Sequence, residues 1–405
     1  MKNKIFYILF LLYIIVLSVS LQKEVQLEHE WKIIMDDFLK NKGYQMYGFP
    51  TAYMPPLYSY YLLICKTIFG FTNWIKISCM IQAIIFYFSL YFLFKTFLGD
   101  GLGKWAIIIL FLSVLFFPPI FIGSISISSF SLSVSIFCVF FALLYKIYYE
   151  KEDKTKKVIF ITFISIAGLY IRYEFLYVII LSGLIYLYLR KIKVFTLFKI
   201  VVFIFLAYLP WTVRNYIEIG KFTYSTSLNY NFAKGNNENY DIFSSYNFPY
   251  APENKRNLSI DVLYKAYNNE KEIDEHLSAL NKEFIQQHPA LFIKLTFQKF
   301  VVNLLQYFPD YNGLSKYGIY IFYSIYFVIF QAILIFAIRR LRSANNDYLS
   351  KFTLGLYLFF LCFYSIAPMP RYFLLFYPIF AVVIIKAFQD GNSCCYKFGS
   401  KKIVS

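Results

Sequence analysis

Charged residues are scarce in this sequence. Only 16% of its 405 residues are Asp, Glu, Lys or Arg, whereas ordinary soluble domains carry about 25%. Hydrophobic residues make up 59% of the chain, aromatic residues make up 22%, and the mean hydropathy is +0.54. This composition excludes an ordinary soluble domain and predicts an integral membrane protein. Nucleic acid is therefore not an expected partner, despite a formal net charge of +17.

Cysteine and histidine are also few, with six and three residues. Four cysteines lie in apolar segments and two, Cys394 and Cys395, lie in the tail, so neither a disulfide framework nor a metal site is indicated. The chain has no Gly-x-Ser-x-Gly, no His-Glu-x-x-His and no nucleotide-binding glycine loop. Asp36 and Asp37 are adjacent and do not form an Asp-x-Asp pair. We therefore predict no cofactor and no metal.

Apolar runs, in contrast, recur along most of the chain. A helix needs about 17 to 25 apolar residues to cross a bilayer. Runs near this length predict an all-α polytopic membrane protein with about ten transmembrane helices. The expected spans are 5–21, 75–97, 105–122, 129–149, 158–171, 175–189, 197–213, 318–338, 352–367 and 372–388.

The topology follows from the loop charges. Lys2 and Lys4 precede the first run, which is long and lacks a small-x-small cleavage site, so we expect a retained helix and not a signal peptide. With the N-terminus in the cytoplasm, the loops "KIYYEKEDKTKK", "RKIKVF" and "RRLRS" and the C-terminal tail are all cytoplasmic and net positive. Counting residues 55–70 as a further span would invert the later loops, so this segment is interpreted as an interfacial helix.

Three regions follow from this topology. Residues 1–213 form an N-terminal transmembrane module that includes a first outer loop, 22–70. Residues 214–316 form one large extracytoplasmic loop, whose acidic and basic residues are equal in number. Residues 317–405 form the C-terminal transmembrane helices and a short basic tail. We expect any chemistry where the two outer loops meet the membrane rim, because sites are usually built on long loops over a rigid scaffold.

Two carboxylates of the first outer loop are candidates for a general base. Glu28 and Glu30 lie near the end of the first span, where partial desolvation raises a carboxylate pKa toward a useful value. Asp36 and Asp37 lie further along an amphipathic stretch and are interpreted as its solvated face.

Cations at the outer ends of helices form a second set of candidates. Arg172, Arg214 and Arg371 each stand at the outer end of a predicted span, and Lys299 lies on an amphipathic outer helix. Convergent cations suit a phosphate or pyrophosphate group, because charge-assisted bonds to phosphate oxygens are strong and specific. Contacts with ordinary anionic lipid head groups are the alternative.

Aromatic and amide residues form the third set. Tyr53, Pro55 and Tyr58 lie in "GFPTAYMPPLY", a rigid aromatic turn that suits the floor of a sugar pocket and equally suits an interfacial tyrosine belt. Asn215 follows Arg214, and Asn236 lies in "KGNNENYD", a stretch suited either to hydroxyl recognition or to a plain turn.

Taken in order, these segments resemble the multi-pass glycosyltransferases of the GT-C fold. Within that fold, the chain is similar to the bacterial branch related to protein O-mannosyltransferases and to the aminoarabinose transferase of lipid A. The motifs that carry the resemblance are "KGYQMYGFPTAYMPPLY", "AGLYIRYEFL", "PWTVRNYIEIGKFTYSTSLNYNFAKGNN", "QQHPALFIKLTFQK" and "PRYFLLFYP".

The resemblance implies an inverting transferase that moves a sugar from undecaprenyl phosphate to a hydroxyl of a glycan, lipid or protein acceptor. The active site is then expected on the outer face of a bacterial inner membrane, with both termini cytoplasmic. A carboxylate of the first outer loop deprotonates the acceptor, and basic residues hold the donor phosphate. The family has an aspartate in that loop; here the stretch is "QLEHEW", so Glu28 or Glu30 takes that role.

Two other functions are weighed against this one. An envelope polysaccharide polymerase or ligase also carries a large outer loop with arginines, but it uses pyrophosphate-linked glycans. A lipid or solute transporter is expected to show ionisable residues at mid-membrane and internal repeats. In this sequence the charges sit at the outer rim and no repeat is visible, which favours the transferase.

Overall fold

The structure is a computed structural model, and the chain is almost entirely helical in the part that it describes. One antiparallel hairpin interrupts the helices, with β1 (Gln45–Met46) paired to β2 (Phe49–Pro50). The described residues are 2–22, 25, 29–40, 43–98, 104–149, 155–190, 192–240, 260–305, 318–343, 347–366 and 373–399.

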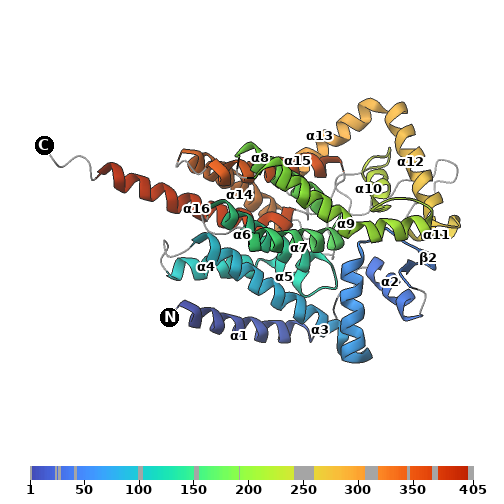
Figure 1. The fold of residues 1–405 in the computed structure, drawn as a ribbon, viewed down its shortest axis with the longest axis horizontal. Helices are drawn as coiled ribbons and strands as arrows, with labels where there is room; N and C mark the ends of the chain where they lie inside the picture. The colour runs from blue at the N-terminus through green and yellow to red at the C-terminus, as the bar shows by residue number, and fades with distance from the viewer. Residues whose placement is uncertain are drawn as a thin grey trace.

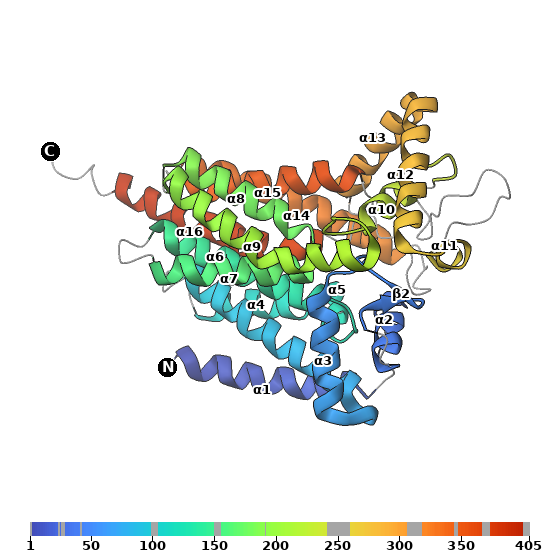
Figure 2. The same cartoon turned by 45° about the vertical axis from the view of Figure 1, so that its right-hand side comes forward.

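Long helices form the larger part of the molecule and run roughly along its long axis (Figures 1 and 2). The N- and C-termini lie at the same end of this bundle. Its helices are α1 (Lys2–Ser20), α3 (Pro56–Leu98), α4 (Lys104–Leu115), α5 (Pro118–Ser124), α6 (Phe130–Tyr149), α7 (Thr155–Ile171), α8 (Phe175–Tyr188), α9 (Val194–Ile219), α14 (Gly318–Ser343), α15 (Asp347–Ile366) and α16 (Phe373–Gly399).

The shorter and more polar elements gather at the opposite end from the termini (Figures 1 and 2). They come from two parts of the chain that are far apart in sequence, the first predicted outer loop and the large one. These elements are α2 (His29–Leu39), the hairpin, α10 (Ser227–Gly235), α11 (Ile260–Ala266), α12 (Glu270–Gln287) and α13 (Pro289–Leu305). The two predicted outer loops therefore lie against each other.

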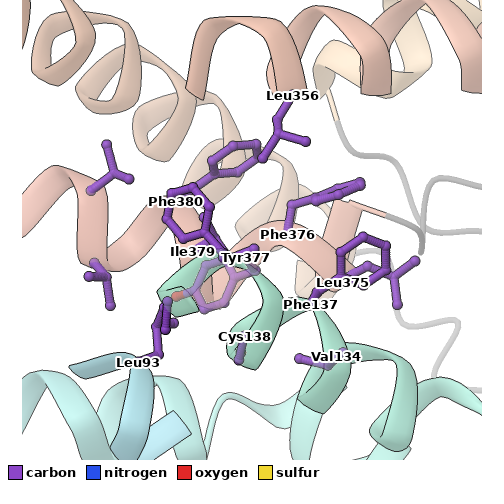
Figure 3. Packing of buried hydrophobic residues seen from close by; sticks show 14 of the residues in the cluster. Leu93, Val134, Phe137, Cys138, Leu356, Leu375, Phe376, Tyr377, Ile379 and Phe380 are labelled. Carbon is purple, nitrogen blue, oxygen red and sulfur yellow. The ribbon is translucent and has the colours of Figure 1, made fainter. Parts of the chain in front are cut away.

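Aromatic side chains fill the core of the bundle, where α16 packs against α3, α6 and α15. Figure 3 shows Phe376 and Tyr377 of α16 near Phe137 and Cys138 of α6, with Phe380 on the side of Leu356 of α15. The Phe137 ring lies 5.1 Å from the Phe376 ring, measured between centroids. This aromatic packing joins helices from the two halves of the chain into one bundle.

Four of the described helices are long and apolar enough to cross a bilayer, judged by length and composition. They span Asn73–Leu98, Phe130–Tyr149, Val194–Ile219 and Tyr348–Ser365, and shorter apolar helices span Ile5–Ser20, Phe175–Tyr188 and Leu374–Gln389. The predicted class, an all-α membrane protein, fits this architecture. The number of ten spans stays a prediction.

The outward face of α9 is apolar. Only 11% of its most apolar window is buried within the protein, and Phe198, Phe205 and Ile217 are exposed. An apolar face of this length suits contact with lipid tails, since exposed apolar patches of this size are rare on soluble monomers.

Three predicted boundaries differ from the structure. The predicted span 105–122 is two helices, because Pro118 lacks the amide hydrogen that would continue α4. Residues 55–70 are continuous with the next span in α3, which bends at Gly70 (φ 72°, ψ −174°). The segment before this bend runs across the bundle direction (Figures 1 and 2), as an interfacial helix would. Finally, α9 does not end at residue 213 but continues to Ile219 and stops at Gly220 (φ 80°).

Candidate active site

The segment 44–54, which carries the hairpin, is the centre of the polar end. Glycines at positive φ, Gly43 (81°) and Gly48 (84°), let the chain enter and reverse tightly. The amide of Thr51 donates to the carbonyl of Tyr44 over 3.3 Å, and the Tyr44 hydroxyl donates to the carbonyl of Met54 over 2.7 Å. The segment therefore holds a compact shape of its own and presents backbone groups to its neighbours.

Arg214 fastens this segment from α9. Its Nη1 donates to the carbonyl of Thr51 and its Nη2 to the carbonyl of Tyr44, each over 2.7 Å. The guanidinium also pairs with Glu218 one turn later and lies over the Trp211 ring, 5.2 Å from its centroid. Arg214 thus joins the end of α9 to the first outer loop through two charge-assisted bonds.

The α7–α8 corner fastens the same segment from another side. The Tyr173 hydroxyl donates to the carbonyl of Ala52 over 2.9 Å. Its neighbour Arg172 pairs with Glu174 at 3.1 Å. Gly168 lies one turn earlier, where an added Cβ would stand 2.5 Å from the buried Phe175 ring. The corner can therefore close only because residue 168 has no side chain.

Glu270 fastens the segment from the large loop. The amide of Ala52 donates to Glu270 Oε1 over 2.7 Å, and the hydroxyls of Tyr264 and Thr226 donate to the two carboxyl oxygens. Glu270 is buried, with only 3% of the residue exposed. Burial raises the pKa of this carboxyl, and the hydrogen bonds of Thr226, Thr51, Tyr264 and Ala52 oppose that rise.

Glu30 lies on the other side of the segment, on α2, and is half-buried. Burial raises the pKa of the Tyr230 hydroxyl, and the charge of Glu30 raises it further. The Tyr230 ring packs edge-on against Tyr53, with 5.6 Å between centroids. The helix that carries Glu30 meets the segment 44–54 directly, because the Gly48 amide donates to Asp37 Oδ2 of α2 over 3.0 Å. The other candidate base, Glu28, lies outside the described residues.

Lys299 of α13 is a buried cation, 1% exposed. Its ammonium donates to the carbonyl of Gly235 over 2.9 Å and to Asn236 Oδ1 over 2.6 Å, and it lies 5.5 Å from the Tyr240 ring centroid. Burial lowers the pKa of Lys299 to about 7. Tyr230 lies within α10 and Asn236 caps its C-terminal end, so the rise of an α-helix puts about 9 Å between them. Lys299 therefore binds the C-terminal end of α10, beyond Tyr230.

The remaining predicted residues are buried in packed surroundings. The Tyr58 hydroxyl donates to Gln82 Oε1 over 3.1 Å. Pro55, three residues before Tyr58, is also buried. Asn215 is 0% exposed and donates to the carbonyl of Thr223 over 2.8 Å. Arg371 lies outside the described residues. Thus Arg214 and Tyr173, the neighbour of Arg172, bind the segment 44–54, which contains Tyr53, and α2 meets the same segment through Asp37. Lys299 and Asn236 lie at the C-terminal end of α10.

Sequence reasoning missed Glu270 and Tyr173. Asn269 caps α12 by accepting from the amide of Glu272 over 2.9 Å, and an Asn before "EKE" is a recognisable helix start. That signal predicts a helix, but it also predicts a solvated Glu270 in the first turn. Only the contact with Ala52, 218 positions earlier, buries this carboxylate.

No group of three or more His, Cys, Asp or Glu that could hold a metal ion occurs within the described ranges. That the protein needs no metal stays a prediction drawn from the sequence.

These observations define a class of protein: a helical bundle with apolar faces that is capped at one end by a hydrogen-bonded polar layer. The sequence matches no protein-family model and no curated protein. Among solved structures, the chain is similar to ArnT from Cupriavidus metallidurans bound to undecaprenyl phosphate. The TM-score is 0.45 and the identity 10%, over 95% of this chain and 77% of that chain. This likeness assigns no activity and no residue role to the present chain.

Proposed function

We propose that this protein is an inverting GT-C glycosyltransferase. It moves a sugar from a polyprenyl-phosphate carrier to a hydroxyl of a cell-envelope acceptor. The reaction takes place on the outer face of a bacterial inner membrane, at the end of the bundle opposite to the termini.

One observation carries this proposal. The motifs that resemble the family lie far apart in the sequence, yet hydrogen bonds join them at one end of the bundle. Ala52 of the first motif accepts from Tyr173 of the second, and the neighbouring Thr51 accepts from Arg214 of the third. Asn236, at the end of the third motif, accepts from Lys299 of the fourth. Polar residues that converge in this way within an apolar protein are typical of a functional site.

The residues divide into two roles. Glu30, or Glu28 before it, takes the proton of the acceptor hydroxyl as that oxygen attacks the anomeric carbon. The bond between the sugar and the phosphate breaks, and the carrier phosphate leaves with the electron pair. Lys299, Arg172 and Arg371 are the candidates to stabilise this leaving phosphate, because fixed cations act where negative charge develops.

The remaining candidates shape the surroundings. Arg214 acts on the site through the segment 44–54, whose carbonyls occupy both of its terminal nitrogens. Tyr53, which packs edge-on against Tyr230, is the candidate for the sugar platform. Pro55, Tyr58 and Asn215 are buried and are assigned to the support of that platform.

The test is transfer from a synthetic polyprenyl-phosphate sugar in detergent micelles with Glu28→Gln, Glu30→Gln and Asp36→Asn proteins. Loss of a general base typically costs about 100-fold or more in kcat. We expect this loss from one of the two glutamate variants, with the affinity for the donor unchanged. Asp36 lies on the exposed face of α2, so its variant should keep the wild-type rate. If both glutamate variants keep that rate, the assignment of the base is wrong. If the unmodified protein turns over no lipid-linked donor, the proposed function is wrong.

A further inference from the structure

Glu270 is a buried carboxylate that the transfer chemistry does not use. It lies at the start of α12, in the large loop, and it contacts the first loop directly. Leaving a carboxylate unpaired in a protein interior is costly, so a buried one must be surrounded by donors. Here the donors are the amide of Ala52 and the hydroxyls of Thr226 and Tyr264.

These donors come from three separate parts of the chain. Thr226 precedes α10, Tyr264 belongs to α11 and Ala52 belongs to the segment 44–54. The backbone of Thr226 also reaches Ala52, because its amide donates to the Ala52 carbonyl over 3.3 Å. Glu270 is therefore a buried point of contact between the two outer loops, which the Tyr47 hydroxyl also joins by donating to Asp261.

The residue that Glu270 holds is adjacent to a candidate site residue. Ala52 has its amide bonded to Glu270 and its carbonyl bonded to Tyr173, so both of its peptide groups are fixed. The next residue, Tyr53, packs against Tyr230, and the same segment meets α2, the helix of Glu30, where the Gly48 amide donates to Asp37 Oδ2 over 3.0 Å. A displacement of Ala52 therefore moves Tyr53 relative to Glu30.

We propose that Glu270 is a positioning residue, which sets Tyr53 and the segment 44–54 against α2 and Glu30 by accepting the amide of Ala52. The role of this arrangement in sugar transfer rests on the proposed function. The tie itself is a property of the fold and can be measured without any substrate.

Three variants test the tie. Glu270→Ala removes every acceptor. Glu270→Gln keeps an amide oxygen for Ala52 and Thr226, and the Tyr264 hydroxyl can turn to accept from its amino group. Asp274→Asn is the matched control: Asp274 is also buried on α12, one turn later, but it pairs with Lys221 and Asn229, within the large loop.

The first measurement is hydrogen exchange of residues 51–54 in the full-length protein in detergent. Loss of a buried hydrogen bond to a charged group is expected to raise local exchange about tenfold or more. We expect this increase for Glu270→Ala and a smaller one for Glu270→Gln, with exchange of α6 unchanged. Asp274→Asn should leave residues 51–54 as protected as in the wild type.

The second measurement separates kcat from KM for transfer. Misplacement by about 1 Å can cost about 100-fold in rate, so Glu270→Ala should lower kcat strongly and Glu270→Gln should restore much of it. If Glu270→Ala does not fold, Tyr173→Phe removes the anchor on the other side of Ala52 and should raise the same exchange.

The proposal is overturned if Glu270→Ala, or Tyr173→Phe in its place, leaves residues 51–54 protected. It is also overturned if Asp274→Asn loosens them equally, since Glu270 would then act only on general stability. If Glu270→Ala raises exchange but transfers sugar at the normal rate, Glu270 does hold residues 51–54, but it does not position them for transfer. Absence of transfer in the wild type would refute the proposed function and leave the exchange result standing.

Discussion

Replacement of Arg214 by lysine distinguishes a brace from a phosphate ligand. A lysine keeps the positive charge but loses the planar fork that reaches two carbonyls at once. In the structure that fork joins the carbonyls of Thr51 and Tyr44, each at 2.7 Å. A single ammonium nitrogen on a flexible stem is expected to keep one of these two bonds.

The magnitude follows from the bond that is lost. A hydrogen bond to a charged group contributes about 1.5 to 3 kcal/mol, and the Arg214 side chain is only 19% exposed. Loss of about 2 kcal/mol corresponds to about a 30-fold increase in the local opening equilibrium of the segment 44–54. The ion pair with Glu218 contributes less, because Glu218 is 45% exposed and exposed pairs contribute about 0 to 1 kcal/mol.

Limited digestion with chymotrypsin measures this opening, because cleavage after Tyr47 requires the hairpin to open. Arg214→Lys should be cleaved about 30-fold faster when reclosing outpaces cleavage, and Glu218→Gln should be cleaved near the wild-type rate. The second measurement is the binding of a polyprenyl phosphodiester, detected by native mass spectrometry. If Arg214→Lys leaves the cleavage rate unchanged but weakens lipid binding, the brace is refuted and Arg214 is a direct phosphate ligand.

Two further predictions concern Lys299 and Gly168. With the pKa of Lys299 lowered to about 7, half of the lysine is charged at pH 7 and about 1% at pH 9, so affinity for a polyprenyl phosphodiester should fall about 50-fold over that range. Lys299→Arg stays charged and should remove this pH dependence; a wild-type affinity that is constant between pH 7 and 9 would refute the role of Lys299. Gly168→Ala should lower stability by about 1 to 3 kcal/mol, because the new methyl meets the buried Phe175 ring. Gly355→Ala, whose methyl would meet only flexible leucine and isoleucine ends at 3.3 Å or more, is the control in thermal unfolding.

Apolar periodicity predicted the helices of the bundle well, since lipid contact requires long apolar segments wherever the chain crosses. The predicted spans 129–149, 158–171 and 175–189 fall on α6, α7 and α8. Errors arose where an apolar run continued across a break in the backbone, as at Pro118. Hydropathy does not register such a break, because proline changes the hydrogen bonding of the helix and not the polarity of the segment.

The candidate site was predictable in its parts but not in its connections. In "YLPWTVRNY", Arg214 follows the Pro-Trp pair by three residues, at the outer end of a predicted span. A charge at the membrane rim suggested an anion ligand. The structure bonds its guanidinium to carbonyls 163 and 170 positions away in the chain, and the role as an anion ligand stays a prediction. No local pattern encodes a backbone carbonyl as the partner of an arginine, because every residue carries one.

The sequence by itself determined the helical, apolar architecture typical of a membrane protein and the two polar segments in which a site is expected. Those properties depend on composition and period, which are local and additive along the chain. The tertiary structure alone decided that Glu270 is buried, that Ala52 is held from three sides and that Tyr53 packs against Tyr230. Such contacts join residues more than one hundred positions apart, and they exist only when the whole bundle has brought its outer loops together.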